Sequence, residues 1–232
     1  MRLHHYVTSL LQKEGFVRYD CVNIKIGELK MKRIIAVLFI ALLFVSMPLF
    51  AKNLISVGYD VSFPTYDFGN VFRGDLVASY GYLGASGSDV SFGLYDSNSF
   101  RIPVNAYDKD FGFTKFDLSK YFDLYITSIT GAAVKVPVAS GKLDIVAGLG
   151  LAVECDFMFE QNKLSDLFID IGAGARIDVI FNITDSIFLD FGAEGTYMLY
   201  EYYADFDYND QGHGSIHRFN IPSCGLRAGI KL

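Results

Sequence analysis

From Lys52 to Leu232, apolar side chains alternate with small or polar ones over long stretches of the chain. The clearest stretch is 143–157, where the odd positions are Leu, Ile, Ala, Val, Cys or Phe and the even positions are mostly Gly, Ala, Asp or Glu. Side chains of a β-strand point alternately to two faces, whereas a helix repeats its faces about every 3.6 residues. The alternation therefore predicts an all-β domain.

The same pattern predicts eight antiparallel strands joined by two kinds of connector. The expected strands lie at 55–63, 76–94, 100–106, 122–138, 143–157, 167–181, 187–199 and 226–232. Short turn-like connectors at 96–99, 139–142 and 182–185 alternate with longer ones near 64–75, 107–121, 158–166 and 201–215. Short turns at one end, long loops at the other and an even number of long strands are typical of transmembrane β-barrels. We therefore expect an eight-stranded antiparallel transmembrane barrel.

The composition of the polar face indicates which face meets lipid. That face is mainly Gly, Ala and Ser with scattered Asp, Glu and Arg and few Lys, which suits a crowded lumen better than a water-facing surface. A soluble barrel with an apolar interior is the alternative. Charges inside a narrow barrel are tolerated when they are paired. The predicted lumen charge network is Asp144, Glu154, Asp170, Arg176, Asp178, Asp190, Glu194, Arg227 and Lys135, with Arg101 and Lys231 as further bases.

A second segment resembles an export signal. Met31, Lys32 and Arg33 precede an apolar run at 34–45, and Ala51 offers a cleavage site. The run is shorter than the about 20 residues that a transmembrane helix needs. We expect 31–51 to be a cleavable signal helix and 52–232 to be the barrel. Residues 1–30 are then either untranslated, with the start at Met31, or an extended n-region, and the destination is the bacterial outer membrane.

Charge and cysteine content exclude several classes of function. Residues 52–232 hold 13 Lys and Arg against 23 Asp and Glu, a formal net charge of −10. Nucleic-acid binding needs clustered basic residues, so we expect no nucleic-acid partner. Cys21, Cys155 and Cys224 are too few and too widely spaced for a disulfide framework or a zinc site. No nucleophile, base and orienting group can be named together, so we expect neither an enzyme nor a cofactor.

The connector at 201–215 is the most distinctive loop candidate. Its aromatic residues Tyr202, Tyr203, Phe206 and Tyr208 suit either an interfacial aromatic girdle or contact with a partner. Asp205, Asp207 and Asn209 have the spacing of the first calcium ligands of an EF-hand, but Asp210 and Ile216 occupy the places of its glycine and closing glutamate. His213 and His217 alone are too few for a tight metal site. We therefore expect no metal.

From Lys52 onwards the chain resembles the small eight-stranded outer-membrane proteins, in particular the OmpW-like and OmpX/OmpA-type barrels. The segment 226–232 is similar to the terminal strand that the barrel-assembly machinery reads, although it ends in Leu232 where that signal usually ends in Phe. The resemblance implies contact with outer-membrane lipid and with that machinery. It leaves three roles open: passive passage of small or apolar solutes, adhesion of the extracellular loops to a host or environmental ligand, or stabilisation of the cell envelope.

Overall fold

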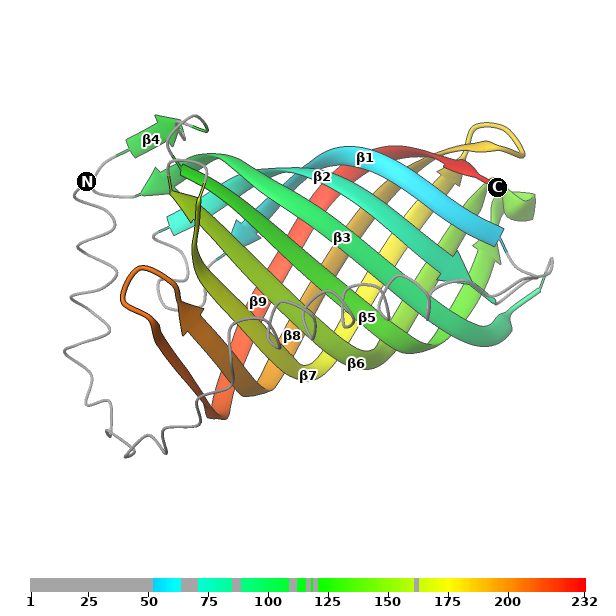
Figure 1. Cartoon of the computed structure of the whole chain (residues 1–232). Coiled ribbons are helices and arrows are strands. Elements are labelled where there is room, and N and C mark those ends of the chain that lie inside the picture. The colour runs from blue at the N-terminus through cyan, green and yellow to red at the C-terminus, as the bar shows by residue number, and fades with distance from the viewer. Residues whose placement is uncertain are drawn as a thin grey trace. The chain divides into compact units, whose positions relative to one another are not determined.

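The computed structural model describes residues 52–63, 71–84, 89–108, 112–115, 118, 121–160 and 163–232. The predicted signal helix at 31–51 and the segment 1–30 lie outside these residues. The described strands are β1 (Lys52–Phe63), β2 (Val71–Leu83), β3 (Ser91–Asp108), β4 (Gly112–Lys115), β5 (Tyr121–Val138), β6 (Leu143–Glu160), β7 (Lys163–Asn182), β8 (Ile187–Asp205) and β9 (Asp210–Lys231) (Figure 1). No helix in this part of the chain is long and apolar enough to cross a membrane.

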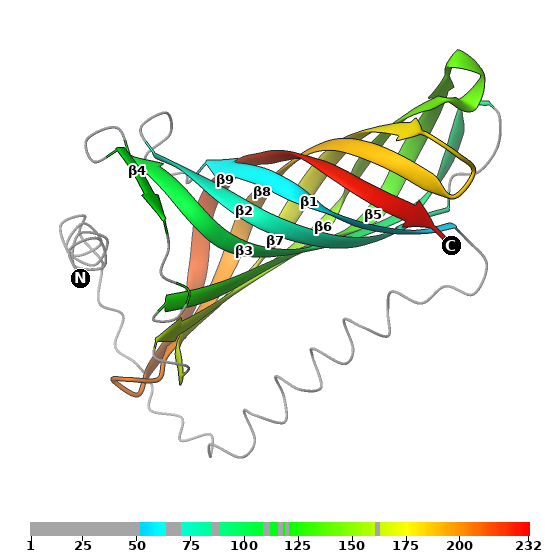
Figure 2. The ribbon, with the colours of Figure 1, turned by 90° about the horizontal axis from the view of Figure 1, so that it is seen from above.

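Eight of the strands close into a ring, as the alternation predicts. Every neighbouring pair is antiparallel, in the order β1-β2-β3-β5-β6-β7-β8-β9, and β9 returns to pair with β1. The short strand β4 lies outside the ring and pairs only with the end of β3. At the seam, Asn53 and Leu232 exchange backbone hydrogen bonds of 3.3 and 2.9 Å (Figure 2). A closed ring has no free edge, so its backbone groups are satisfied without water.

One end of the barrel carries tight turns. A 3₁₀ turn at Ala139–Gly141 joins β5 to β6, and Ala139 and Ser140 both have positive φ there. Residues 183–186 join β7 to β8, and the Thr184 hydroxyl accepts hydrogen bonds from the backbone of the next residues. These turns lie at the same end as the seam residues 52 and 232 (Figure 1). Both turns were predicted from their composition.

The predicted turn at 96–99 is wrong, because β3 runs through it without a break. Each of these residues is paired on both sides, with 79–82 of β2 and with 127–130 of β5. The break between β2 and β3 falls instead within 84–90, inside the strand expected at 76–94. Asp, Asn and Ser favour turns through local hydrogen bonds. Two neighbouring strands supply the backbone partners here, so the ladder overrides that local preference.

Two of the predicted long connectors, 158–166 and 201–215, are mostly strand. The structure leaves only 161–162 between β6 and β7, and β8 and β9 are paired up to Asp205 and Asp210. The pairing thus extends well beyond the residues that alternate cleanly. Where strands extend beyond the membrane, neither of their faces contacts lipid, and both can be polar. The sequence of these segments therefore lacks the alternation of apolar and polar residues by which a strand is predicted.

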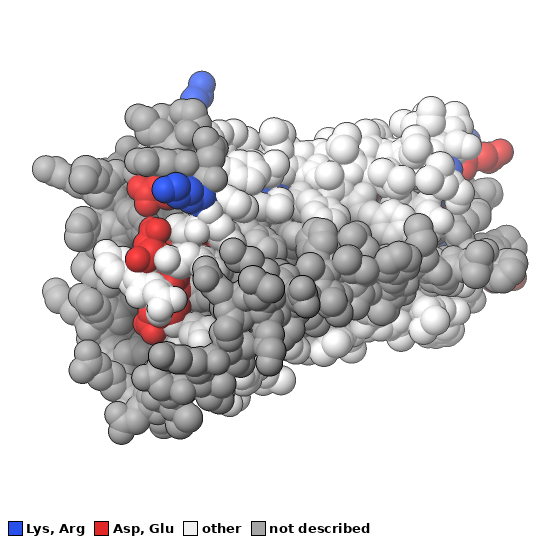
Figure 3. Space-filling view, viewed as in Figure 1, with Lys and Arg blue, Asp and Glu red and all other residues white. Residues whose placement is uncertain are grey.

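The two faces of the ring differ in the sense expected for a membrane protein. Large apolar side chains lie outside, and Phe92 is 81% exposed. Charged side chains lie inside, where Arg101 and Arg227 are each 1% exposed. On the face in view, the described charged side chains gather mostly at the two ends, with a largely uncharged belt between them (Figure 3). A water-soluble barrel would show the opposite distribution.

Candidate functional site: the charged lumen and the β8–β9 hairpin

The guanidinium of Arg101, on β3, crosses the interior of the barrel. Its Nε donates to Asp60 Oδ2 at 3.3 Å and its Nη1 to Thr127 Oγ1 at 2.9 Å. Its Nη2 donates to Ser223 Oγ at 2.9 Å and to a carboxylate oxygen of Glu194. One side chain on β3 thereby ties together β1, β5, β8 and β9. Hydrogen bonds to charged groups are about twice as strong as neutral ones, which makes this a rigid cross-brace.

Arg176, on β7, forms the second brace and shares Glu194 with the first. Its Nη1 donates to Glu194 Oε2 at 2.8 Å, and its Nε donates to Asp178 Oδ1 at 2.7 Å. Its Nη2 lies 3.4 Å from Asp190 Oδ2. The hydroxyl of Tyr95 donates to Asp178 Oδ2 at 3.1 Å. Glu194 therefore bridges two guanidinium groups that would otherwise repel each other.

Arg227, on β9, closes the set. Its Nε and Nη2 donate to the two oxygens of Asp60 at 3.1 and 2.5 Å, and its Nη1 lies 3.8 Å from Asp190 Oδ2. We call Asp60, Arg101, Arg176, Asp178, Asp190, Glu194 and Arg227 the central network. Its three cations and four anions are all buried. Buried ions are stable only when paired, and each member has at least one partner of opposite charge.

The structure places the nine predicted lumen residues on the inner face, but in separate groups. Arg176, Asp178, Asp190, Glu194 and Arg227 belong to the central network. Lys135 and Asp144 pair at 3.5 Å near the end that carries the tight turns. Glu154 and Asp170 lie toward the opposite end. Asp60 was missed as a network member, although its place on the polar face of 55–63 could have indicated it; Arg73, Asp75 and Arg218 were missed as well.

The end of the lumen opposite the tight turns is acidic, and we call it the vestibule. Three small groups line it. Arg73 forms an ion pair with Asp75 at 2.7 Å, and Arg218 forms ion pairs with Asp170 and, at 3.2 Å, with Glu201. Glu154 accepts hydrogen bonds from Thr196 at 2.6 Å and from Asn220 at 2.5 Å. Asp156 adds a further carboxylate near Arg73. Acids outnumber bases in these groups, and red acidic side chains gather at this end in Figure 3. Among the described residues, no three His, Cys, Asp or Glu side chains are grouped as metal ligands.

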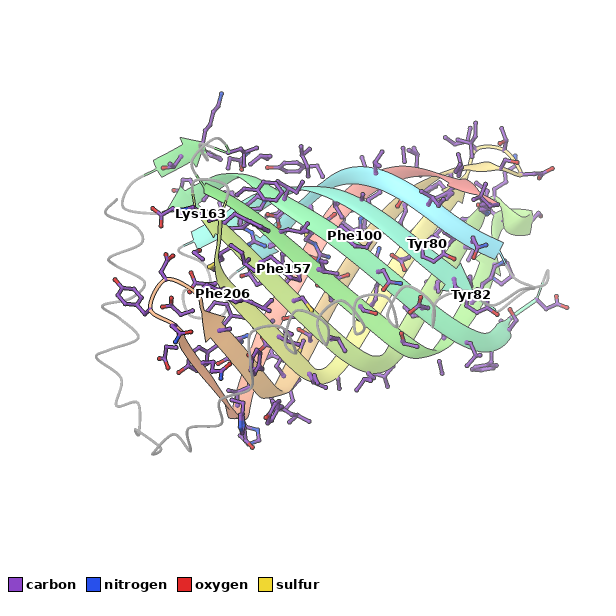
Figure 4. The ribbon with its side chains drawn as sticks, viewed as in Figure 1. Tyr80, Tyr82, Phe100, Phe157, Lys163 and Phe206 are labelled. Atoms are coloured by element: carbon purple, nitrogen blue, oxygen red, sulfur yellow. The ribbon has the colours of Figure 1, made fainter. Side chains whose placement is uncertain are left out.

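The hairpin of β8 and β9 extends beyond this vestibule. At its turn, residues 206–209, the Asp205 Oδ1 accepts the backbone N–H of Asp207 and of Tyr208, each at 3.0 Å. Asp205, the first residue of the spacing that resembles a calcium loop, thus stabilises the turn. Of the four predicted interaction residues, Phe206, which Figure 4 labels, and Tyr208 lie at the exposed turn. Tyr208 is 85% exposed. Tyr202 and Tyr203 lie on β8 and are partly buried.

Two tyrosine–histidine pairs, which the sequence did not suggest, stiffen the hairpin. The rings of Tyr200 and His213 stack at 5.9 Å, and Tyr197 lies beside His217 with its hydroxyl 3.1 Å from Nδ1. Both pairs join β8 to β9 on the outer face. Cross-strand aromatic pairs of this kind contribute about 0.2–1 kcal/mol each. The exposed turn therefore lies at the end of a hairpin stem, the paired strands β8 and β9 beyond the vestibule, which these contacts stabilise.

A closed ring of eight antiparallel strands with an apolar outer face and a paired, charged lumen defines a class of protein: the small transmembrane β-barrel. Barrels of this build span bacterial outer membranes, and the chain is an integral outer-membrane β-barrel protein. No family model matches the sequence. No curated protein is significantly similar to it.

Several solved structures of small outer-membrane proteins are similar to the chain, at low sequence identity and with TM-scores below 0.5. The attachment invasion locus protein Ail of Yersinia pestis, in complex with the heparin analogue sucrose octasulfate, is 12% identical, with 78% of this chain and 99% of that chain covered and a TM-score of 0.39. Neisserial surface protein A is 16% identical, with 78% and 94% covered and a TM-score of 0.42. The outer membrane protein OprG of Pseudomonas aeruginosa is 9% identical, with 78% and 96% covered and a TM-score of 0.45.

Proposed function

We propose that the chain is a closed barrel that presents the β8–β9 hairpin outside the cell for contact with a partner. The central network is the observation that carries this proposal. An eight-stranded barrel has an interior just wide enough for its own side chains. Here the guanidinium groups of Arg101, Arg176 and Arg227 occupy the middle of that interior and hold six strands together. The proposal assigns no catalytic step to the chain.

Passage of solutes through the lumen has less support from this geometry. A solute would have to separate ion pairs such as Arg101–Glu194, and separating a buried pair costs about 3–5 kcal/mol. The inner face beyond the acidic vestibule carries this buried charged network rather than an apolar path. Passage of apolar molecules, which the resemblance to OmpW-like barrels implies, would therefore need a rearranged interior.

The hairpin has the properties of a contact element. Large rings that are already exposed and carried on a stiff stem lose little entropy on binding, which is why tyrosine is common at recognition surfaces. The turn also carries Asp207 and Asp210, next to the acidic vestibule. A partner that fits these groups is a surface that combines basic and apolar side chains.

We expect a shortened hairpin to lose this binding. Replacing 203–212 with Asn-Gly joins Tyr202 to His213, which face each other across the hairpin, through a two-residue turn that preserves their register. Cells that display this variant should bind immobilised polylysine about tenfold less than cells with the native chain. The pair Phe206→Ser and Tyr208→Ser should lose most of the same binding.

The control is Ile183→Ser, which changes an exposed apolar residue in the turn between β7 and β8 at the other end of the barrel. It should bind like the native chain. Equal binding by the native and shortened chains, or native binding no stronger than that of cells without the protein, would contradict the proposed role of the hairpin.

A closed lumen also predicts the electrical behaviour of the protein. In planar bilayers the native chain should give no sustained single-channel current. The paired change Arg101→Ser and Glu194→Ser should give one, because it empties part of the lumen while every other network ion keeps a partner. Steady currents from the native chain would show that the lumen is open and would favour passage over display.

A further inference from the structure

A patch of polar side chains interrupts the apolar outer face of β3 and β5. Along β3 the outward positions are Phe92 and Leu94, then Asp96 and Asn98, then Phe100. The strand therefore returns to apolar residues on both sides of the polar pair. On β5 the outward positions facing them are Thr130 and Ser128, again between apolar neighbours.

The strand register gathers these residues into one cluster. Asp96 lies between Thr130 of β5 and Tyr82 of β2, and Asn98 lies between Ser128 and Tyr80. Figure 4 labels Tyr80, Tyr82 and Phe100 on this side of the barrel. We call the cluster the polar island; its members are Tyr80, Tyr82, Asp96, Asn98, Ser128 and Thr130.

Hydrogen bonds within the polar island centre on a carboxylate. Thr130 Oγ1 donates to Asp96 Oδ1 at 2.6 Å, and Asn98 Nδ2 donates to Asp96 Oδ2 at 2.8 Å. Tyr80 donates from its hydroxyl to Asn53 Oδ1 at 2.9 Å. Asp96 is buried beneath its neighbours, whereas Thr130 is exposed. The island is therefore an organised hydrogen-bonded group in which Thr130 is exposed and the other members are buried or partly exposed.

Its position requires an explanation, because a carboxylate facing hydrocarbon is costly and such groups usually mark a function. Tyrosine in an interfacial girdle would account for Tyr80 and Tyr82 alone. It does not account for Asp96 and Asn98, since Phe92 and Leu94 lie between them and the nearer end of β3. On β3 and β5 the polar island thus lies within the apolar belt.

We propose that the polar island is the contact surface for a second copy of this chain, with the two-fold axis along the membrane normal. Two barrels inserted in the same direction present the island at the same depth, so it meets its own counterpart. The island contains both donors, the Thr130 and Tyr80 hydroxyls and the Asn98 amide, and an acceptor, the Asp96 carboxylate. Hydrogen bonds between copies remove these groups from lipid, where polar contacts hold membrane segments together.

The side chains around the polar island are small enough for two barrels to approach each other closely. The outward residues beside the island include Ala78 on β2, Ala132 on β5 and Ser128 itself. Small residues of this kind let two membrane-embedded backbones come near each other. Larger apolar side chains, Leu94 and Leu149, stand at the rim and would seal the contact against lipid. The inference is independent of the proposed hairpin function, because neither the lumen nor the hairpin takes part.

Cross-linking in native outer membranes tests the proposal. In a chain with Cys21, Cys155 and Cys224 changed to alanine, Ala132→Cys places a thiol at the edge of the intact island. The matched control is Leu226→Cys on β9, an outward position that is 59% exposed and lies across the ring from β5. With copper–phenanthroline, we expect Ala132→Cys to give a disulfide-linked species of twice the chain mass, in about tenfold higher yield than Leu226→Cys.

A second variant separates dimer formation from folding. In the Ala132→Cys chain, the further changes Asp96→Leu and Thr130→Val remove the carboxylate and the hydroxyl that donates to it. We expect this variant to give about tenfold less cross-linked dimer while the barrel keeps its heat-modifiable gel mobility. The proposal is overturned if Ala132→Cys gives no more dimer than the control, if the cross-linked partner is another protein, or if the dimer persists in the Asp96→Leu, Thr130→Val background.

Discussion

Glu194→Ala is expected to lower the free energy of unfolding of the barrel by about 3–5 kcal/mol, because it leaves buried charges without a partner. Glu194 accepts hydrogen bonds from Arg101 and, at 2.8 Å, from Arg176. Without this carboxylate the two guanidinium groups face each other across a space closed to water. Losing one partner of a buried pair costs more than losing both, so the paired change Arg101→Ser and Glu194→Ser should cost less than the sum of the two single changes.

Urea unfolding of the protein in lipid vesicles measures this effect, and the temperature at which the folded gel band is lost provides a second readout. Glu194→Gln keeps an acceptor and should fall between the native chain and Glu194→Ala. Asp185→Asn, in the exposed turn between β7 and β8, should stay within about 0.5 kcal/mol of the native chain. A loss below about 1 kcal/mol for Glu194→Ala would mean that water already solvates the network.

Ile177→Arg should destabilise the inserted barrel by about 2–4 kcal/mol, the cost of a cationic side chain on the lipid face near the bilayer midplane. Ile177 points outward from β7, is 54% exposed, and has Ala147 and Ala193 as its cross-strand neighbours. No acidic partner lies opposite it on either strand. In a water-soluble barrel the same substitution would change the free energy of unfolding very little. The size of the destabilisation therefore distinguishes a ring with its apolar face toward lipid from one with its apolar face inside.

The matched control is Ile183→Arg, which places the same cation in the turn beyond the end of β7. Its cost should be about 0–1 kcal/mol, since charge near the interface is solvated. Urea titration in vesicles compares the two variants under one condition. An Ile177→Arg protein as stable as Ile183→Arg would show that the outer face of β7 does not meet hydrocarbon.

Much of the architecture can be predicted from the sequence. The period of two identifies β6, β7 and β8 and sorts their residues between the faces, because this alternation is a local property of each strand. The glycine-rich, sparsely charged second face indicates a lumen rather than a wet surface. Short polar segments at 139–142 and 182–185 identify the tight turns, since no strand ladder runs through their central residues and local preference decides.

The sequence was misleading where tertiary pairing overrides local preference. Residues 96–99 have the composition of a turn, yet ladders on both sides hold them in β3. The same misreading concealed the polar island, because a turn would not place Asp96 on the lipid face. The β8–β9 stem was also missed, since its residues beyond the membrane lack an apolar face.

The sequence by itself determined for most residues which side chains face inward and which face outward, because between β-bulges that choice depends only on the parity of a residue within its strand. The tertiary structure decided which of them meet. Arg101 and Glu194 are 93 positions apart, and Asp60 and Arg227 are 167 apart. These contacts follow from the stagger between neighbouring strands and the closure of β1 on β9. Register and closure are properties of the whole ring, so no local pattern contains them.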